Sequence, residues 1–515
     1  MKNLLIIGSG AREHAMLMKV EQSNSEFNHN YNLYGIGPTA NPGLIKLCAQ
    51  NGGTYTVGSI VDAALILSVC KKYAITLAVI GPEAPLEVGV VDVLLKNNIA
   101  VVGPPKQLAQ IETSKSFTRD FLATFLAEAS PEYYVVTSLE EAIVAIKTLK
   151  EAYVIKTDGL AGGKGVLIAQ EHLFTDEMAI SHCQELFKHG KKFVIEEKLV
   201  GQEFSLMTLT DGKSFLHLPA LQDHKRAYEN DTGPNTGGMG SYTDKGGCLP
   251  FLSEEELEKA KIYNEIVIKE LSEWGGVPYK GVLYGGYMVC ATGVKVIEFN
   301  ARFGDPEAIN LMYLLESDII DLFERIATGN LRGYKLRLKE QATVCTYVVP
   351  QNYPNVTNEK EVIEIGQIPA DVMLCFGSLE SQGNSYYALG SRTLALVTGG
   401  ATIKEAREKI VKSICSIKGK IRYRRDIASE QLIQKRIEHM NYLRRPLRIA
   451  VLGSTKGSDL IPIINAINAK RINSEIVLVL SDKIEAPILQ KAAKYNLKHA
   501  VLSEKGVKRE QQIDD

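Results

Sequence analysis

Apolar runs that end in glycine turns open the chain. The run at 4–7 leads into Gly-Ser-Gly-Ala-Arg-Glu-His at 8–14, and a mixed polar and apolar stretch then precedes a second run at 32–36. Two later runs, each followed by a Gly-Pro turn, lie at 74–80 and 100–102. Strand, turn and helix in this order predict a parallel sheet covered by helices, with a ligand crevice at the carboxyl ends of the strands. We expect this first domain to end near residue 103.

The pattern changes three times further along. A predicted helix at 113–127, alternating strands and a glycine-rich loop indicate an α+β region over 104–324. Residues 325–427 are mostly strand-like, and 428–446 form a predicted helix that ends at Arg-Arg-Pro. Apolar runs at 447–452 and 474–480 then restart an α/β unit of about two strands. The predicted fold class is therefore α/β with several domains and a partial α/β tail at 447–515.

Composition argues against several classes of function but does not identify the function of the chain. The 515 residues include 59 basic and 60 acidic side chains, for a formal net charge of -1, so no general attraction to nucleic acid or anionic membrane is expected. The eight cysteines are scattered without zinc-ligand spacing, which favours free thiols in a reducing compartment. No signal peptide or apolar run of roughly 18–20 residues is recognisable. We expect a cytoplasmic protein.

Two glycine-rich segments suit phosphate groups. In the segment 155–166, Lys156 lies on a strand and Lys164 lies in a loop with Gly162, Gly163 and Gly165, whose amides can fold over phosphates. No Ser or Thr follows Lys164, so this is not a Walker A loop, and a plain glycine hairpin is the alternative. At 8–14, Glu13 replaces the third glycine of the dinucleotide fingerprint, which disfavours nicotinamide. The helix start and Arg12 still suit a phosphate, although a structural turn is the alternative.

The strand at 296–303 carries the strongest signal. Its period of two places Glu298, Asn300 and Arg302 on one face and the apolar residues Ile297, Phe299, Ala301 and Phe303 on the core side. A carboxylate and an amide oxygen suit Mg²⁺ whose coordination is completed by nucleotide phosphates, and Arg302 can hold an anion. An exposed polar strand face is the alternative.

Further polar segments complete the candidate chemistry. The segment 222–226 and the glycine-rich loop 231–240 fit a small polar ligand, with a disordered surface loop as the alternative. The end of an apolar strand carries Glu196, Glu197 and Leu199, followed by Glu203. These residues fit an adenine-binding edge and a ribose-hydroxyl acceptor, although isolated acids at a strand end are more often solvated.

Taken together, the segments GSGAREH, SKSFTRDFL, KTDGLAGGKGV, QDHKR, DTGPNTGGMGSY and VIEFNARFGDPE closely resemble the phosphoribosylamine–glycine ligase family over about 1–427. The resemblance implies a Rossmann-like N-terminal domain at 1–103, an ATP-grasp region at 104–324 and a small β-rich C-terminal domain at 325–427. The chain departs from the family at Ala11, at Gly162 and around 389–392. None of these changes removes a charged group from the implied site.

The same resemblance implies roles for individual residues. Lys115, Lys156 and Lys164 would contact nucleotide, with Gly162, Gly163 and Gly165 over its phosphates, Glu196 and Leu199 at the adenine and Glu203 at the ribose. Glu298 and Asn300 would hold Mg²⁺ or Mn²⁺. The glycine and 5-phosphoribosylamine sites would be lined by Asp223, Lys225, Arg302 and Asp305. The ribosyl phosphate would lie on the loop of Gly8, Gly10, Arg12, Glu13 and His14.

The implied activity is ATP-dependent ligation of glycine to 5-phosphoribosylamine through glycyl phosphate. Another ATP-grasp ligase or carboxylase is one alternative, and a non-catalytic scaffold that docks a formyltransferase is the other. The tail segment RIAVLGSTKGSDL resembles the start of the glycinamide ribonucleotide formyltransferase family, but Thr455 and Asp459 differ from its phosphate loop. The formyl-transfer residues of that family would lie beyond Asp515. We therefore expect no formyl transfer, and a contact with a separate formyltransferase as the remaining role.

Overall fold

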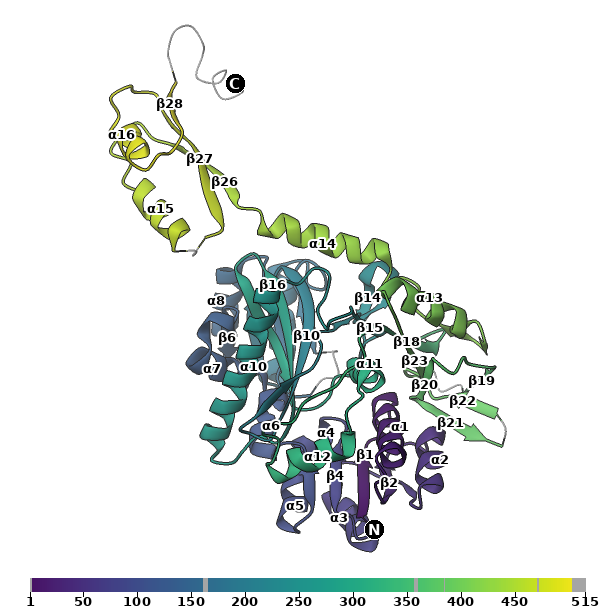
Figure 1. The fold of residues 1–515 in the computed structure, drawn as a ribbon. Coiled ribbons are helices and arrows are strands. Elements are labelled where there is room, and N and C mark those ends of the chain that lie inside the picture. The colour runs from purple at the N-terminus through teal and green to yellow at the C-terminus, as the bar shows by residue number, and fades with distance from the viewer. Residues whose placement is uncertain (1, 161–164, 356–359, 384, 470–471, 503–515) are drawn as a thin grey trace. The chain divides into compact units, whose positions relative to one another are not determined.

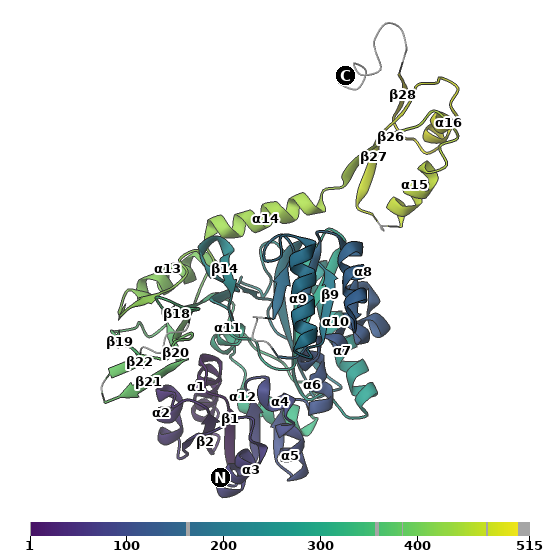
Figure 2. The same cartoon turned by 180° about the vertical axis from the view of Figure 1, so that it is seen from behind.

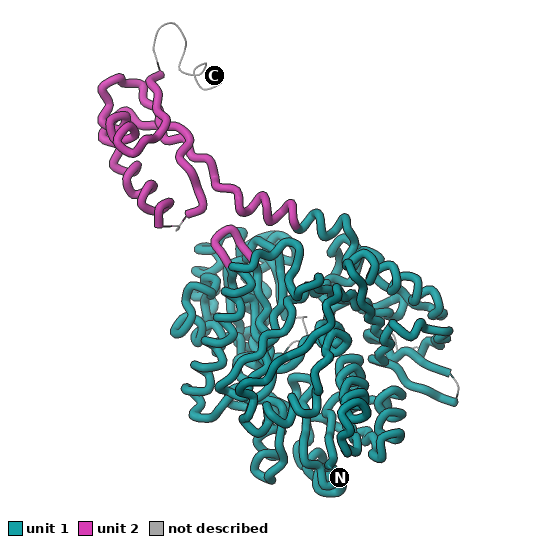
Figure 3. The backbone as a smooth tube through the Cα atoms, viewed as in Figure 1, with its two compact units in different colours: residues 1–288, 294–436 teal, residues 289–293, 437–515 magenta. Residues whose placement is uncertain are grey.

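The computed structural model describes residues 2–160, 165–355, 360–383, 385–469 and 472–502. The chain forms two compact units (Figure 3): residues 1–288 with 294–436, and residues 289–293 with 437–515. Among the described residues, no helix is long and apolar enough to cross a membrane.

The N-terminal sheet has the strand order β3-β2-β1-β4-β5, and every neighbouring pair is parallel. Its strands are β1 (Lys2–Ile7), β2 (Tyr31–Gly37), β3 (Tyr55–Val57), β4 (Leu77–Ile80) and β5 (Ala100–Val102). Leu4 is paired with Leu33 on one side and Leu77 on the other, and all three are buried. The connecting helices are α1 (Ala11–Glu26), α2 (Pro42–Gln50), α3 (Ala63–Lys72), α4 (Ala84–Glu87) and α5 (Val90–Lys96) (Figure 1). The predicted parallel sheet is confirmed.

Two further sheets follow, and the first is antiparallel throughout. The first, β6-β9-β7-β8, consists of β6 (Tyr133–Val136), β7 (Tyr153–Thr157), β8 (Val166–Ile168) and β9 (Phe193–Glu197). Helices α8 (Leu139–Leu149) and α9 (Asp176–Lys188) share an apolar core with it (Figure 2). The second, β11-β10-β16-β17, consists of β10 (Gly201–Thr210), β11 (Phe215–His217), β16 (Gly281–Cys290) and β17 (Gly293–Asn300). Helix α10 (Glu254–Gly275) packs against β10.

The helix predicted at 113–127 corresponds to a helix at 115–125, and a separate helix that was not predicted precedes it. Helix α6 (Lys106–Thr113) ends at Ser114, where the backbone is extended, and α7 (Lys115–Phe125) begins immediately after it. The Ser114 hydroxyl accepts the Phe117 N–H at 3.2 Å and so caps α7. A short 3₁₀ turn, η1 (Ala127–Ala129), follows α7. The break places Lys115 at the first position of a helix.

The C-terminal part of the first unit is built on two antiparallel sheets. One sheet runs β12-β15-β18-β23-β20, with β25 paired to β18, and a second runs β21-β22-β19-β24. The strands are β12 (Gln222–Asp223), β15 (Gly240–Thr243), β18 (Ala342–Pro350), β19 (Glu361–Ile365), β20 (Met373–Phe376), β21 (Leu379–Gln382), β22 (Ser385–Ala388), β23 (Leu394–Gly400), β24 (Ile417–Lys418) and β25 (Ile421–Arg422). Helices α11 (Glu307–Leu314) and α13 (Ile403–Ile414) pack against β18 and β23, whereas α12 (Ile319–Thr328) packs against α1, β4 and β5.

The polar segment and loop predicted at 222–240 are largely strand. Besides β12 and β15, they contain a hairpin of β13 (Arg226–Tyr228) and β14 (Thr232–Asn235), joined through the 3₁₀ turn η2 (Glu229–Asp231). Strand pairs within the segment thus order its backbone, with a shift of register between Arg226 and Tyr228.

The second unit contains the tail. Helix α14 (Glu430–Arg444) leads into a parallel sheet of β26 (Leu447–Leu452), β27 (Ser474–Ser481) and β28 (His499–Val501). Helices α15 (Leu460–Asn468) and α16 (Pro487–Lys494) share an apolar core with this sheet. The expectation of about two strands was one strand short.

Candidate active site

Glu298 on β17 is surrounded by positive charge. Burial raises the pKa of its carboxyl, but Lys225, Lys156, Lys115 and Arg302 outweigh this and hold the pKa below its usual value. Glu298 is therefore ionised at neutral pH. The Asn300 Oδ1 on the same strand accepts from the Arg302 Nη2 at 3.5 Å.

These two oxygen-bearing residues fit a divalent cation only in part. An ionised carboxylate and an amide oxygen are hard ligands of the kind that Mg²⁺ and Mn²⁺ accept. No cluster of three or more His, Cys, Asp or Glu suitable for a metal is found in the described residues. The donor set thus fits an ion that takes its remaining ligands from a nucleotide and water.

Glu196 on β9 joins two cations inside the protein. Its carboxylate forms an ion pair with Arg119 of α7 and lies 2.8 Å from the Lys156 Nζ of β7. Burial raises the pKa of Glu196, but Arg119 and Lys156 outweigh it, and the pKa lies below its usual value. The side chain of Glu196 is engaged within the protein, so its polar contacts to an adenine would come from the main chain of this strand end, which leads to Leu199.

Arg119 was not among the residues singled out from the sequence. It is 2% exposed, and its guanidinium donates to the Val296 carbonyl at 3.1 Å and to the Ile297 carbonyl at 2.7 Å. One side chain thereby ties α7 and β9 to the strand that carries Glu298. A signal was present, because Arg119 lies three residues before the buried Leu122 and so falls on the apolar face of its helix.

The glycine-rich loop is anchored where it leaves β7. The Asp158 carboxylate accepts the backbone N–H of Lys115 and the Ser116 hydroxyl, and the Lys115 Nζ donates to the Gly159 carbonyl at 2.8 Å. The Thr157 N–H donates to the Gly165 carbonyl at 2.9 Å, which closes the base of the loop. Gly162, Gly163 and Lys164 lie outside the described residues.

Asp223 and Lys225 line a small pocket together with Glu203, Ser205, Tyr284 and Ile297. Burial and the Glu307 carboxylate raise the pKa of Asp223 well above its usual value. Burial lowers the pKa of Lys225, but Glu203 and Glu298 outweigh this and raise it well above its usual value. The Lys225 Nζ lies 3.1 Å from the Glu203 Oε2. Ile297 was expected on the core side, but it is only half-buried and faces this pocket.

Arg302 is held between two carboxylates that the sequence did not single out. Its Nε lies 3.2 Å from the Glu83 Oε2, and its Nη2 lies 3.0 Å from the Glu112 Oε1. Burial lowers the pKa of Arg302, but the two acids outweigh it and raise the pKa. The positive charge of Arg302 is thus balanced by these two carboxylates within the protein.

Asp305 connects the site to the β-rich part. Its Oδ1 accepts the Tyr347 hydroxyl at 2.6 Å, and its Oδ2 lies 2.8 Å from the Arg392 Nη2. Two residues later Glu307, buried at the start of α11, accepts the Tyr284 hydroxyl at 2.9 Å and the Ser205 hydroxyl at 3.2 Å. Asp305 therefore acts at least as a structural link between segments far apart in the sequence.

In the Gly8–His14 segment, Glu13 fills the helix start. Its carboxylate accepts the Gly10 N–H at 2.6 Å and lies 2.7 Å from the Arg12 Nε. Gly8 has φ +133, and a Cβ there would lie 2.5 Å from the Glu13 Cγ, so the turn requires glycine. Arg12 also donates to the Phe303 carbonyl at 2.9 Å.

His14 is turned toward the β-rich part. Its Nδ1 accepts the Phe376 N–H at 2.9 Å, and burial lowers its pKa to about 4, so the ring is neutral. The ring also stacks on Phe376. The segment thus joins three regions of the first unit, and the phosphate role predicted for it stays a prediction.

Family models of the phosphoribosylglycinamide synthetase type match most of the chain. The N-domain model matches residues 2–112, the ATP-grasp domain model 113–308 and the C-domain model 343–430. A phosphoribosylamine–glycine ligase of Methanosarcina barkeri is 40% identical over 441 residues, which cover 86% of this chain and 99% of the relative.

Solved structures agree with this similarity. The crystal structure of a phosphoribosylamine–glycine ligase from Thermotoga maritima is 26% identical, with a TM-score of 0.68 over 82% of this chain and 100% of that chain. The biotin carboxylase domain of the 2-oxoglutarate carboxylase of Hydrogenobacter thermophilus has a TM-score of 0.64 over 85% of this chain and 94% of that chain. At 14% identity, that second likeness concerns the fold alone.

Proposed function

The chain belongs to the phosphoribosylamine–glycine ligase family, and we propose that it uses ATP to join glycine to 5-phosphoribosylamine, giving glycinamide ribonucleotide, ADP and phosphate in purine biosynthesis. The observation that carries this proposal is an ionised Glu298 facing Lys115, Lys156 and Lys225. Such a cluster suits a polyphosphate and a divalent ion, whose charges balance those of the side chains.

The reaction needs activation because a carboxylate is anionic and has no good leaving group. An oxygen of the glycine carboxylate attacks the γ-phosphorus, and the bond from that phosphorus to the departing ADP breaks. The amine of phosphoribosylamine then attacks the carbonyl carbon of glycyl phosphate. The bond from that carbon to phosphate breaks, and the attacking nitrogen loses a proton. No enzyme nucleophile takes part in either step.

Three lysines neutralise the charge that moves in the first step. Lys156 and Lys115 are held beside Glu298 by their bonds to Glu196 and Gly159, so they are positioned before the nucleotide arrives. Lys164, with Gly162, Gly163 and Gly165, would complete the phosphate contacts. Glu298 and Asn300 would hold Mg²⁺ or Mn²⁺, which when bound supplies charge neutralisation at the phosphates.

Asp223 and Lys225 fit the two ends of glycine. Burial and Glu307 raise the pKa of Asp223 more than Lys225 and Arg392 lower it, so its ionised form needs further positive charge. Within the described residues its buried Oδ1 has no hydrogen-bond partner. The ammonium of glycine supplies both. Lys225 then faces the glycine carboxylate, and Arg302 and Asp305 lie toward phosphoribosylamine.

A substrate-omission assay tests the proposal. ADP release should require glycine and phosphoribosylamine together, and bicarbonate should not replace glycine. Glu298→Gln should lower kcat at least about a hundredfold, because it removes the charge that holds the metal. The exposed Glu151 provides the control, and Glu151→Gln should leave the rate unchanged. Bicarbonate-dependent ADP release would indicate a carboxylase, and full activity of Glu298→Gln would exclude this site.

The intermediate has its own test. Glycine labelled with ¹⁸O in its carboxylate should pass one label into phosphate during turnover. Unlabelled phosphate, with product still formed, would exclude glycyl phosphate while leaving the ligase activity in place.

For the tail we propose no formyl transfer, and a contact with a separate formyltransferase. Lys491 of α16 donates to the Lys456 carbonyl at 2.5 Å and to the Gly457 carbonyl at 3.2 Å, so the segment that resembles a phosphate loop is bonded from within. Folate-dependent formylation of glycinamide ribonucleotide by the purified chain would refute the first statement. Failure of a purified formyltransferase to sediment with the chain would refute the second.

A further inference from the structure

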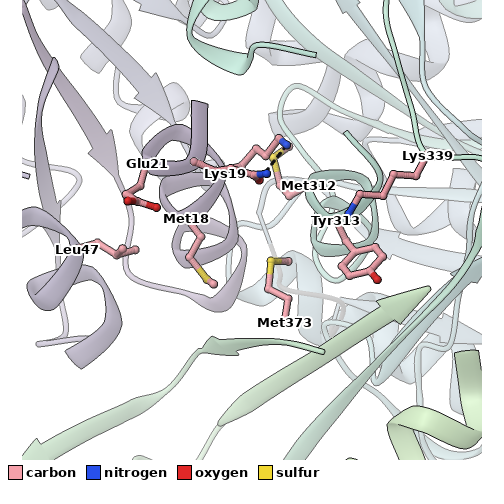
Figure 4. Close-up of a pocket in the computed structure, with 9 residues that line it drawn as sticks. Met18, Lys19, Glu21, Leu47, Met312, Tyr313, Lys339 and Met373 are labelled. Carbon is pink, nitrogen blue, oxygen red and sulfur yellow. Dashed lines mark hydrogen bonds between the residues drawn. The ribbon is translucent and has the colours of Figure 1, made fainter. Parts of the chain in front are cut away.

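A second cavity lies apart from the candidate active site. It has a volume of about 260 Å³ and is lined by side chains of α1, α2, α11, β20 and the segment before β18 (Figure 4). Its apolar wall consists of Met18, Leu47, Met312 and Met373. Methionine side chains adapt their shape to an apolar group, so such a wall accepts ligands of varied outline.

Lys19 brings a buried positive charge to this cavity. The residue is 5% exposed, and its Nζ donates to the Gln22 Oε1 at 3.0 Å. Within the described part of the chain, that is the only hydrogen bond of an ammonium that carries three donors. Burial lowers the pKa of Lys19, and the nearby Lys339 adds to the lowering, although the carboxylates of Glu26, Glu316 and Asp318 oppose it. A buried ammonium with spare donors gains stability from an anion.

Lys339 places a second ammonium on the same wall. Its Nζ lies 4.2 Å from the centroid of the Tyr313 ring, a cation–π contact that Figure 4 shows at the edge of the cavity. The lining contains one carboxylate, Glu21, against these two cations. The lining itself therefore carries a net positive charge beside an apolar surface, and the carboxylates of Glu26, Glu316 and Asp318 near Lys19 offset part of that charge.

We propose that this cavity binds a small organic anion, with its carboxylate or phosphate between Lys19 and Lys339 and a compact apolar body against the methionines. None of the residues assigned to the ligase reaction lines the cavity. Two of the helices that line it nevertheless begin beside residues assigned to the reaction, because α1 starts one residue before Arg12 and α11 starts two residues after Asp305. The anion site is thus connected to the site of ligation through two continuous helices.

A fluorinated aromatic acid tests the proposal on the full chain. 4-(Trifluoromethyl)benzoate, followed by ¹⁹F NMR, should show saturable binding that persists when ADP and Mg²⁺ are present in excess. Its neutral counterpart, 4-(trifluoromethyl)benzyl alcohol, should bind roughly tenfold more weakly, because it lacks the charge-assisted bonds. Equal binding of the two probes, or loss of benzoate binding on addition of ADP, would overturn the proposal.

Two variants locate the binding. Lys19→Met keeps the length and apolar stem of the side chain and should weaken benzoate binding roughly tenfold. Lys339→Met tests the same point at a half-buried position where folding is little affected. Lys46→Met, on the exposed side of α2, is the matched control and should bind as the parent does. Unchanged affinity in both Lys19→Met and Lys339→Met would overturn the proposal.

Competition with the bound fluorinated benzoate shows whether the cavity accepts a phosphate or a carboxylate as the anionic group. If phenyl phosphate displaces the bound benzoate, the proposal holds with a phosphate accepted at the two lysines. If it does not, while unlabelled benzoate does, the proposal holds with a carboxylate as the head group. If neither displaces the probe, the binding is not at an anion site and the proposal fails.

Discussion

Replacing Glu112 by glutamine removes a carboxyl group whose pKa is strongly displaced. Burial raises the pKa of Glu112 from 4.5 to about 7, and Glu83 adds to this, although Arg302 and the Ala301 N–H oppose it. Two carboxylates share one guanidinium here. Glu83 keeps a pKa below its usual value because Arg302 and Arg12 outweigh the effect of burial on it. Glu112 is therefore the partner that holds a proton at mildly acidic pH.

The size and sign of the effect follow from proton linkage. The displacement from 4.5 to about 7 corresponds to roughly 3 kcal/mol, and the 4% side-chain exposure of Glu112 leaves little solvent screening. Because the folded pKa is raised above the unfolded value, protonation stabilises the fold. This contribution is fully present below about pH 4.5 and is lost as the pH rises through about 7. Glu112→Gln, which cannot ionise, should not lose it.

Urea unfolding of the full chain from about pH 5 to about pH 8.5 measures this difference. Trp274 is the only tryptophan of the chain and lies on α10 with its ring 5.0 Å from that of Phe117, so its fluorescence reports on the neighbourhood of α6 and α7. Subtracting the wild-type free energy of unfolding from that of Glu112→Gln removes the titrations that the two proteins share. As the pH rises over this range, the free energy of unfolding of Glu112→Gln should increase by roughly 3 kcal/mol relative to that of the wild type.

A control variant and two contradicting results complete the test of the Glu112 prediction. Glu151→Gln, at an exposed position, should give a flat difference over the same pH range. A Glu112→Gln difference that varies by less than about 0.5 kcal/mol, or that falls with rising pH, would refute a proton held by Glu112.

Three further changes should show effects of known direction. Arg119→Met should destabilise the fold by roughly 3–5 kcal/mol in urea unfolding, because Glu196 stays buried with only Lys156 as its partner; a loss below about 1 kcal/mol would contradict this. Asp158→Ala should raise the KM for ATP roughly tenfold, since it releases the start of α7 from the phosphate loop, and an unchanged KM would count against that role. Ser253→Ala should cost about 1 kcal/mol in the same unfolding assay through loss of the α10 cap, and no loss would show that the cap is redundant.

The fold was most predictable where strong turn residues bound an apolar run. The runs at 100–102 and 447–452 coincide with β5 and β26, because Gly103 follows the first and Gly453 the second. Helix α13 was missed inside a region interpreted as strand, although Ile403, Ala406 and Ile410 show the helical spacing of three and four residues. Strand β28 had no such signal, since all three of its residues are exposed and burial imposes no pattern on them.

The placement of the candidate residues along their strand was more predictable than the charge pairs around them. Residue types and strand period were enough to indicate that Glu298 and Asn300 share a face. The partners of the charged residues were not predictable, because Arg392 lies 87 residues from Asp305 and Glu112 lies 190 residues from Arg302 along the chain. Such pairs form only when separate elements pack, and a single sequence contains no local trace of them.

The carboxylate of Glu13 has a consequence for anion selectivity at the first helix. The position that a helix offers to an incoming phosphate already holds an internal anion, bonded to the Gly10 amide and paired with Arg12. Any ligand that binds these donors must displace the Glu13 carboxylate. A weakly bound monoanion such as chloride would replace these bonds with weaker ones, so its binding is not favoured. For the phosphate predicted to bind at this helix start, displacing Glu13 requires more charge and more oxygens than a carboxylate offers.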